Sequence, residues 1–119
     1  MDGVSEEDEL LRRVFAFHLN DDGTVRSSAF ELRPGERGVS VDFARIRSIA
    51  DALAAAGRND LGMVVLAARV PHEIGFVVQP DPLPDNQAHA LIVGPFTQSN
   101  RRKLAGACRV AVPPPVLGR

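Results

Sequence analysis

Tryptophan and tyrosine are missing from this 119-residue chain, and cysteine occurs once. A single cysteine excludes an internal disulfide framework and a zinc site built from several cysteines. With only six phenylalanines as large aromatic residues, few rings are left on which nucleic acid bases could stack. No apolar run approaches the roughly 18 residues that span a bilayer, and the acidic N-terminus is unlike a secretory signal. We therefore expect a soluble, cytoplasmic protein without membrane contact.

Lysine is almost absent as well, because thirteen of the fourteen basic residues are arginine. The planar guanidinium group suits bidentate contacts with phosphate or carboxylate. Residues 1–9 carry five acids and no base, so the other 110 residues hold fourteen bases against ten acids, a charge of +4. This charge is far below that of a dedicated nucleic-acid-binding domain. Nucleic acid is therefore the least favoured partner.

The length and composition fit one globular domain. Hydrophobic residues make up 45% of the chain and charged residues 24%, as in ordinary soluble domains, and 119 residues are enough for one core. We predict an acidic disordered leader over 1–9, a single α+β domain over 10–111 and a proline-rich tail over 112–119.

Hydrophobic periodicity predicts the elements of the domain. Alternation predicts strands, an Asn-Asp-Asp-Gly turn at 20–23 predicts a hairpin, and a 3.6-residue period predicts helices. The predicted strands cover 11–19, 25–32, 39–41, 61–68, 74–79 and 88–94, and the predicted helices cover about 43–56 and 98–110. We expect an α+β fold with a curved or partly closed mixed β-sheet of about six strands and both helices packed against it.

The first candidate site is the sequence Arg26-Ser27-Ser28, on the predicted second strand. Side chains alternate along a strand, so Ser28 would face away from Ser27. One of these serines could be a nucleophile or could bind phosphate beside Arg26. A serine nucleophile needs an adjacent base, and the Gly-x-Ser-x-Gly elbow is absent. Two hydroxyls that bond to nearby backbone are the simpler interpretation.

The second candidate site is the start of the predicted helix at 43. Asp42 is expected to cap that helix, because a short carboxylate accepts hydrogen bonds from the free amides of the first turn. Catalysis by Asp42 is the alternative. Arg45 follows in the first turn and could hold an anion there, although Asp42 would occupy the same amides first.

The third candidate site is the proline-rich loop before the last strand. Asp81, Asp85 and Asn86 lie in this loop, and His89 opens the strand. A histidine can act as acid or base near neutral pH, and Asp81 or Asp85 could orient its imidazole ring. The alternative is a half-buried histidine that only bonds to the loop.

Metal ligands and cofactor motifs are not apparent. His18, His72 and His89 show no close spacing of the kind that zinc sites use. Cys108 is better explained as a small core residue of the last helix. We expect no metal site and no cofactor.

The order of several short motifs resembles a family of small uncharacterised bacterial proteins. The pattern is Ser-Ser-Ala-Phe, then Leu or Val before Ser-Val-Asp, then a proline-containing loop, then a strand that begins His-Ala and ends in Gly. Here these motifs occupy 27–30, 39–42, 81–86 and 89–94, and the resemblance covers about 12–108. It implies no known activity and no catalytic residues, but it does imply that the segments belong to one design. From this we form the hypothesis that Ser28, Asp42 and His89 converge on one concave face.

Two classes of function remain. The favoured class is an accessory or adaptor protein that holds a protein partner, or a second copy of itself, through the proline-rich loop and an exposed sheet edge. The alternative is a small hydrolase or transferase for a phosphate-containing or nucleotide-like substrate, with His89 as acid or base. A nucleic-acid-binding module comes third.

Overall fold

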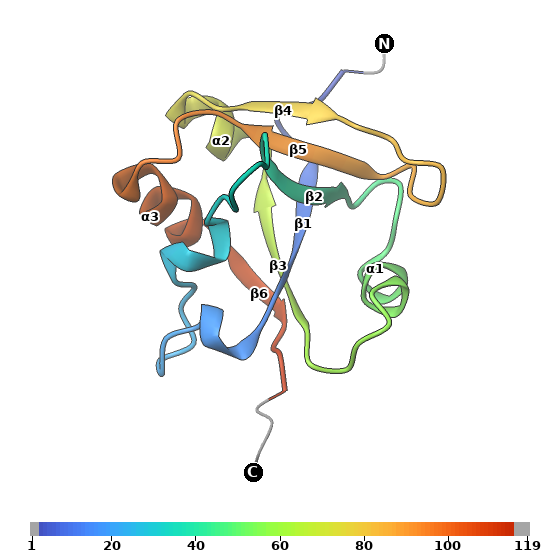
Figure 1. Ribbon diagram of the computed structural model, residues 1–119, viewed down its shortest axis with the longest axis vertical. Coiled ribbons are helices and arrows are strands. Elements are labelled where there is room, and N and C mark those ends of the chain that lie inside the picture. Colours follow the sequence, from blue (N-terminus) through green and yellow to red (C-terminus); the bar gives the residue numbers. More distant parts are fainter. Residues whose placement is uncertain (1–2, 116–119) are drawn as a thin grey trace.

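A computed structural model describes residues 3–115 as an open sheet with helices and turns on its two faces (Figure 1). These residues form six strands, three α-helices and two 3-10 turns, η1 and η2. In chain order the elements are β1 (Glu9–Val14), η1 (Ala16–His18), η2 (Ser27–Phe30), β2 (Val39–Phe43), α1 (Ile49–Ala55), β3 (Gly62–Ala67), α2 (Arg69–Ile74), β4 (Val77–Pro80), β5 (His89–Val93), α3 (Gln98–Gly106) and β6 (Arg109–Val112).

The α+β fold class and the number of about six strands are confirmed, although the six strands are not all the predicted ones. The strand order is β4-β5-β2-β1-β3-β6, and every pairing of these strands is antiparallel rather than mixed. In Figure 1, β4, β5 and β2 run across the top of the molecule, whereas β1 and β3 run along its long axis. The sheet is therefore strongly twisted and not closed.

The twist is concentrated where β1 meets β2. These strands share only two residue pairs, Leu10 with Phe43 and Leu11 with Asp42, whereas β1 and β3 share six. Beyond the short ladder, the Arg12 side chain spans the gap, and its NH1 donates to the Ser40 carbonyl at 2.9 Å. A side chain thus replaces the missing ladder bonds and satisfies a carbonyl that β1 does not reach.

Apolar side chains cover both faces of the sheet. The larger core holds Phe30, Leu66 and Leu104, beneath η2, α2 and α3. The smaller core lies beneath α1 and contains Met63 and Val65. Because β3 contributes to both cores, its sequence is a continuous apolar run, and its position agrees with the predicted strand at 61–68.

The predicted helix over 43–56 starts later than expected. Phe43 closes β2, pairs with Leu10 and is buried in the larger core. Residues 44–48 form a turn, and α1 begins after Ser48, whose Oγ accepts from the amide of Asp51 at 3.1 Å. Asp42 is therefore a buried strand residue and not a helix cap. Burial of the Phe43 ring and its strand pairing prevail over the helical spacing.

The predicted strand over 25–32 is also wrong. Only Leu19 and Val25 form a bridge, after the confirmed turn at 20–23. Local bonds, such as the amide of Ala29 to the carbonyl of Arg26 at 3.0 Å, close the 3-10 turn η2 instead. Consecutive residues Ala29 and Phe30 are both buried, so side chains do not alternate here.

Helix α2 and strand β6 were not predicted, and neither were the 3-10 turns η1 and η2, which lie within the predicted strands over 11–19 and 25–32. Helix α2 contains Pro71, which is tolerated because it lies in the first turn, where its missing amide has no intrahelical partner. The predicted helix over 98–110 ends at Gly106, and β6 then pairs with β3. Thr97 caps α3, because its Oγ1 accepts from the amide of Asn100 at 3.1 Å.

A few described residues of the predicted leader and tail belong to the folded domain. Asp8 is buried and Glu9 begins β1, so the last two residues of the predicted leader over 1–9 belong to the folded domain. Val112 ends β6. Residues 1–2 and 116–119 of the predicted leader and tail lie outside the described residues. Within 3–115, no helix has both the length and the apolar character needed to cross a membrane.

Gly62 is required by the close approach of the C-terminal segment. A Cβ at this position would lie 2.3 Å from the Val112 carbonyl oxygen and 2.4 Å from the Pro114 nitrogen, both of which are backbone atoms. We expect Gly62→Ala to displace β6 and to lower the free energy of unfolding by roughly 1–3 kcal/mol, as overpacking does. The midpoint of urea unfolding would measure this loss.

Gly106→Ala is the matched control, because no atom lies within 4 Å of a Cβ there. Since Gly106 ends α3, alanine should raise stability by up to about 1 kcal/mol through its helix propensity. Equal unfolding midpoints for Gly62→Ala and the parent chain would contradict the assigned packing of β6.

Candidate functional site

His89 lies between a carboxylate and a hydroxyl. Its Nδ1 is 3.0 Å from Oδ2 of Asp81, and its Nε2 is 3.1 Å from Oγ of Ser40. Asp81 follows β4, His89 opens β5, and Ser40 lies on β2, which pairs with β5. The loop over 81–88 returns the chain so that the Asp81 amide donates to the His89 carbonyl at 2.9 Å. The predicted orientation of the His89 ring by Asp81 is thus present as geometry.

The partners of His89 fix the position of its proton. Nδ1 is 3.0 Å from the Asp81 carbonyl oxygen as well as from the Asp81 carboxylate. Both atoms can only accept, so Nδ1 carries the hydrogen. In the neutral ring, Nε2 therefore has a lone pair that accepts from the Ser40 hydroxyl. This is the tautomer that a general base needs in order to take a proton from serine.

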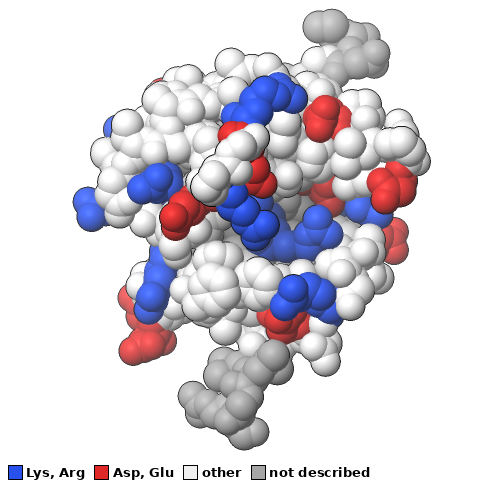
Figure 2. All heavy atoms as spheres, viewed as in Figure 1, with Lys and Arg blue, Asp and Glu red and all other residues white. Residues whose placement is uncertain are grey.

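The Ser40–His89 pair opens into a cavity of about 450 Å³. Its polar lining is completed by side chains from β1, the turn before α1 and the proline-rich loop: Arg13, Arg47, Asp85 and Asn86. Arg13 and Arg47 are balanced by Asp85, which also lines the cavity, and by Asp42, whose Oδ2 lies 3.7 Å from Arg47 NH1. Figure 2 shows that basic side chains gather in and around a hollow near the middle of the face that it presents. The guanidinium groups of Arg13 and Arg47 are the groups in this cavity that can bind an anionic ligand.

Asp42 contacts two residues that line this cavity, Asn86 and Arg47. Its side chain is buried, with 4% of the residue exposed, and it lies opposite His89 in the β2–β5 register. The Nδ2 atom of the Asn86 side chain donates to Asp42 Oδ1 at 2.8 Å, and Arg47 NH1 lies 3.7 Å from Oδ2. Asp42 therefore fixes the proline-rich loop and Arg47 in place. A small cavity of about 40 Å³ beneath it is lined by Asp42, Ser40, His89 and Arg12, among other residues.

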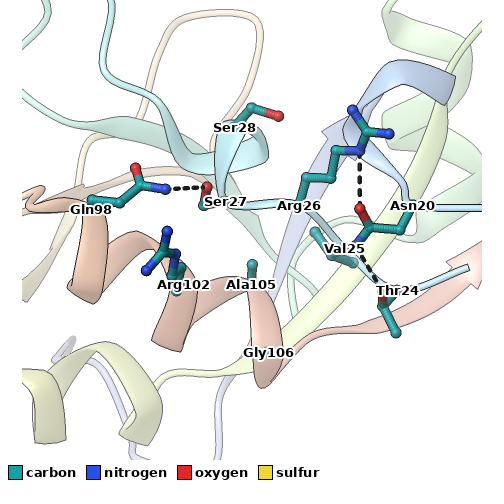
Figure 3. A pocket seen from close by; sticks show the side chains of 10 residues that line it. All are labelled: Asn20, Thr24, Val25, Arg26, Ser27, Ser28, Gln98, Arg102, Ala105 and Gly106. Atoms are coloured by element: carbon teal, nitrogen blue, oxygen red, sulfur yellow. Dashed lines mark hydrogen bonds between the residues drawn. The ribbon is translucent and has the colours of Figure 1, made fainter.

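The structure does not bring the predicted serines to His89. Ser27, Ser28 and Arg26 line a separate open groove of about 680 Å³ between η2 and α3 (Figure 3). Gln98 donates to Ser27 Oγ at 3.2 Å, and Arg26 donates to Asn20 Oδ1 at 3.1 Å. The hypothesis that Ser28 converges with Asp42 and His89 is therefore wrong for Ser28 and correct for the other two.

Arg45 also lies apart from the cavity. Its Nε pairs with Asp8 Oδ1 at 2.8 Å, and its guanidinium lies 4.8 Å from the centre of the Phe43 ring. Because the helix begins at Ile49 and not at 43, Arg45 has no free amides beside it with which to form an anion site. It fastens the N-terminal segment to the end of β2.

Sequence reasoning missed Ser40, Arg13 and Arg47. A signal for Ser40 exists, since Val39, Val41 and Phe43 alternate with Ser40 and Asp42 on one strand, which places both polar residues on one face. No local signal shows that this face adjoins His89, because that depends on which strands pair.

Known proteins add no assignment. No family model, curated protein or solved structure matched this chain in comparison, and the resemblance to a bacterial family stays a prediction.

In the described part of the chain, no three His, Cys, Asp or Glu side chains are grouped so as to hold a metal ion. The large exposed apolar residues Phe17, Ile46, Val77 and Leu83 come from four separate segments, and the binding of a protein partner likewise stays a prediction.

Proposed function

We propose that this protein is a small hydrolase or transferase for a phosphate-containing substrate, with Ser40 as nucleophile and His89 as general base. The observation that supports this proposal is the His89 ring, held between Asp81 Oδ2 at 3.0 Å and Ser40 Oγ at 3.1 Å. Nucleophile, base and orienting group are the three parts that activate a serine hydroxyl. The enzyme alternative expected from the sequence is retained, with Ser40 in place of Ser28.

The proposed reaction begins with attack of Ser40 Oγ on phosphorus. The Oγ–P bond forms, the bond from phosphorus to the leaving oxygen breaks, and the Ser40 proton passes through His89 Nε2 to the leaving group. A water or an acceptor hydroxyl then attacks the phosphorus of the seryl ester, the Oγ–P bond breaks, and His89 Nε2 passes the proton of the attacking oxygen to Ser40 Oγ. Asp81 stabilises the imidazolium that forms in each step.

Arg13 and Arg47 support the choice of an anionic substrate. Both line the 450 Å³ cavity beside Ser40. Arg13 NH1 donates to the Ala52 carbonyl at 3.1 Å, which anchors the side chain to α1. A guanidinium group positioned in this way can bind the non-bridging oxygens of a phosphoryl group and stabilise the charge that develops there.

A fluorophosphonate probe tests the nucleophile, because its phosphorus reacts with activated serine hydroxyls and releases fluoride. We expect one probe molecule per chain, attached to Ser40 in peptide mapping by mass spectrometry. Ser40→Ala and His89→Gln should abolish labelling while thermal unfolding stays cooperative. Ser99→Ala, which removes an exposed hydroxyl of α3, is the matched control and should be labelled like the parent chain.

Two results would contradict the proposal. One is an unlabelled parent chain at probe concentrations that label ordinary serine hydrolases. The other is a label that persists in Ser40→Ala or maps to Ser28. If Ser40 is labelled, the rates at which the parent chain hydrolyses p-nitrophenyl phosphate and bis(p-nitrophenyl) phosphate distinguish phosphomonoester from phosphodiester substrates. Ser40→Ala gives the background rate for each substrate.

A further inference from the structure

A further cavity is lined in part by Arg12, the residue whose NH1 donates to the Ser40 carbonyl. Its volume is about 320 Å³, within the range of small-molecule sites. The polar lining comes from β1, η1, η2 and the loop that follows η2, and consists of Arg12, His18, Ser28, Glu31 and Arg33. Two arginines against one glutamate give an excess of one positive charge. The rings of Phe15 and Phe17 form the apolar part of the wall.

Arg12 brings a largely desolvated charge to this cavity. Its Nε donates to the Ala29 carbonyl at 3.0 Å and its NH1 to the Ser40 carbonyl at 2.9 Å. Burial lowers the pKa of Arg12 to about 10, with Glu36 acting in the opposite direction and Arg33 adding to the shift. The guanidinium thus stays charged at neutral pH.

Within residues 3–115, no carboxylate forms an ion pair with Arg12 or with Arg33. A charge removed from water and paired only with carbonyl groups is one that a bound anion would stabilise.

His18 adds a neutral hydrogen-bond donor. Its Nδ1 accepts from the Phe15 amide at 3.0 Å, so in the neutral ring Nε2 carries the hydrogen. Burial lowers the pKa of His18, and the charges of Arg12 and Arg33 lower it further. The ring therefore stays neutral at pH 7 and offers Nε2–H as a donor rather than a third positive charge.

Phe17 supplies an exposed ring surface. Its ring stacks on that of Phe15 with centroids 5.1 Å apart and planes 9° from parallel, yet 64% of Phe17 is exposed. The Arg58 guanidinium lies 4.9 Å from the centre of the Phe15 ring, which holds the stack in place. An exposed, fixed aromatic ring at the edge of a cationic cavity is suited to stacking against a planar ligand.

We propose that this cavity binds a small planar ring that carries an anionic group. The ring stacks on Phe17, and the carboxylate or phosphate is bound by Arg12, Arg33 and the Nε2–H of His18. Ser28, a candidate nucleophile or phosphate-binding residue from the sequence, lines this cavity and can contribute its hydroxyl. This site is separate from the Ser40–His89 cavity and does not depend on the proposed reaction.

Isothermal titration calorimetry tests the site with four probes. Adenosine monophosphate and benzoate combine a planar ring with a phosphate or a carboxylate, whereas adenosine and inorganic phosphate each supply one part. We expect at least one of the first two to bind more tightly than both separate parts, and the preferred one identifies the anionic group. Failure of both ring anions to bind up to millimolar concentration would overturn the proposal, as would equal binding of adenosine or phosphate alone.

Three variants locate the binding. Arg33→Gln should weaken it by roughly tenfold or more, because a hydrogen bond to a charged group is lost, and Phe17→Ala by roughly three- to tenfold through lost stacking. Arg69→Gln, on the exposed surface of α2 away from the cavity, is the matched control and should bind like the parent chain. Unchanged affinity in both Arg33→Gln and Phe17→Ala would assign the ligand to a different place and overturn the inference.

Discussion

Asp81→Asn is expected to slow fluorophosphonate labelling of Ser40 by about 10²-fold. The carboxylate stabilises the imidazolium that forms when His89 takes the serine proton, and an amide lacks that charge. The tautomer is expected to survive, because His89 Nδ1 also lies 3.0 Å from the Asp81 backbone carbonyl, which the substitution keeps. The loss should therefore be smaller than the roughly 10⁴-fold that a wrong tautomer causes in a serine protease triad.

Pseudo-first-order labelling rates between pH 6 and 9 measure this effect. Asp21→Asn, an exposed aspartate in the turn at 20–23, is the matched control and should keep the parent rate at every pH. A rate for Asp81→Asn within twofold of the parent would remove Asp81 from the mechanism. A loss as complete as that of Ser40→Ala would instead show that the backbone carbonyl does not hold the ring.

The parts of the fold that depend on local patterns could be predicted from the sequence. The apolar run at 61–68 became β3 because both faces of that strand are covered. Asn20 to Gly23 formed the expected turn, with Gly23 at a φ of +87°, a backbone conformation that glycine adopts without strain. Thr97 capped α3 as its position before a helical pattern indicates.

The errors arose where tertiary contacts prevailed over local patterns. Phe43 fits the helical spacing with Ile46 and Ile49, but its ring is buried in the larger core and its backbone pairs with Leu10 in the sheet. Ser27 and Ser28 fit an alternating strand, but the local bonds of η2 satisfy that backbone instead. In both places, the burial of an aromatic ring, Phe43 or Phe30, selects the observed conformation.

In the candidate site, too, one part follows from local sequence and another depends on tertiary structure. The Asp81–His89 pair could be predicted, because the two residues flank one proline-rich loop and a hairpin returns the chain on itself. Ser40 lies 49 residues from His89, and only the pairing of β2 with β5 brings them together. A single sequence does not reveal which strands pair, and Ser27 and Ser28 carry the same hydroxyl chemistry as Ser40, so the sequence alone does not single out Ser40.

The thiol of Cys108 is expected to react about a thousandfold more slowly in the folded chain than in the unfolded chain at pH 8. Burial raises the pKa of this thiol from 9.0 to about 12, although the Arg12 charge lowers it somewhat. Only the thiolate attacks, and a difference of about three pH units changes the thiolate fraction by about 10³. Sγ also lies 3.3 Å from the Leu104 carbonyl, to which the thiol donates.

Because Cys108 is the only cysteine, iodoacetamide uptake with and without 6 M urea measures this ratio directly.

The raised pKa of the Cys108 thiol also makes the free energy of unfolding pH-dependent. Above pH 9 the unfolded chain loses its thiol proton first, so stability falls as the pH rises toward 12. Arg12 opposes this trend only above about pH 10, where the folded chain begins to lose its guanidinium proton first. Between pH 9 and 10, Cys108→Ala should therefore flatten the decline, and a native thiol that reacts within tenfold of the unfolded rate would contradict its burial.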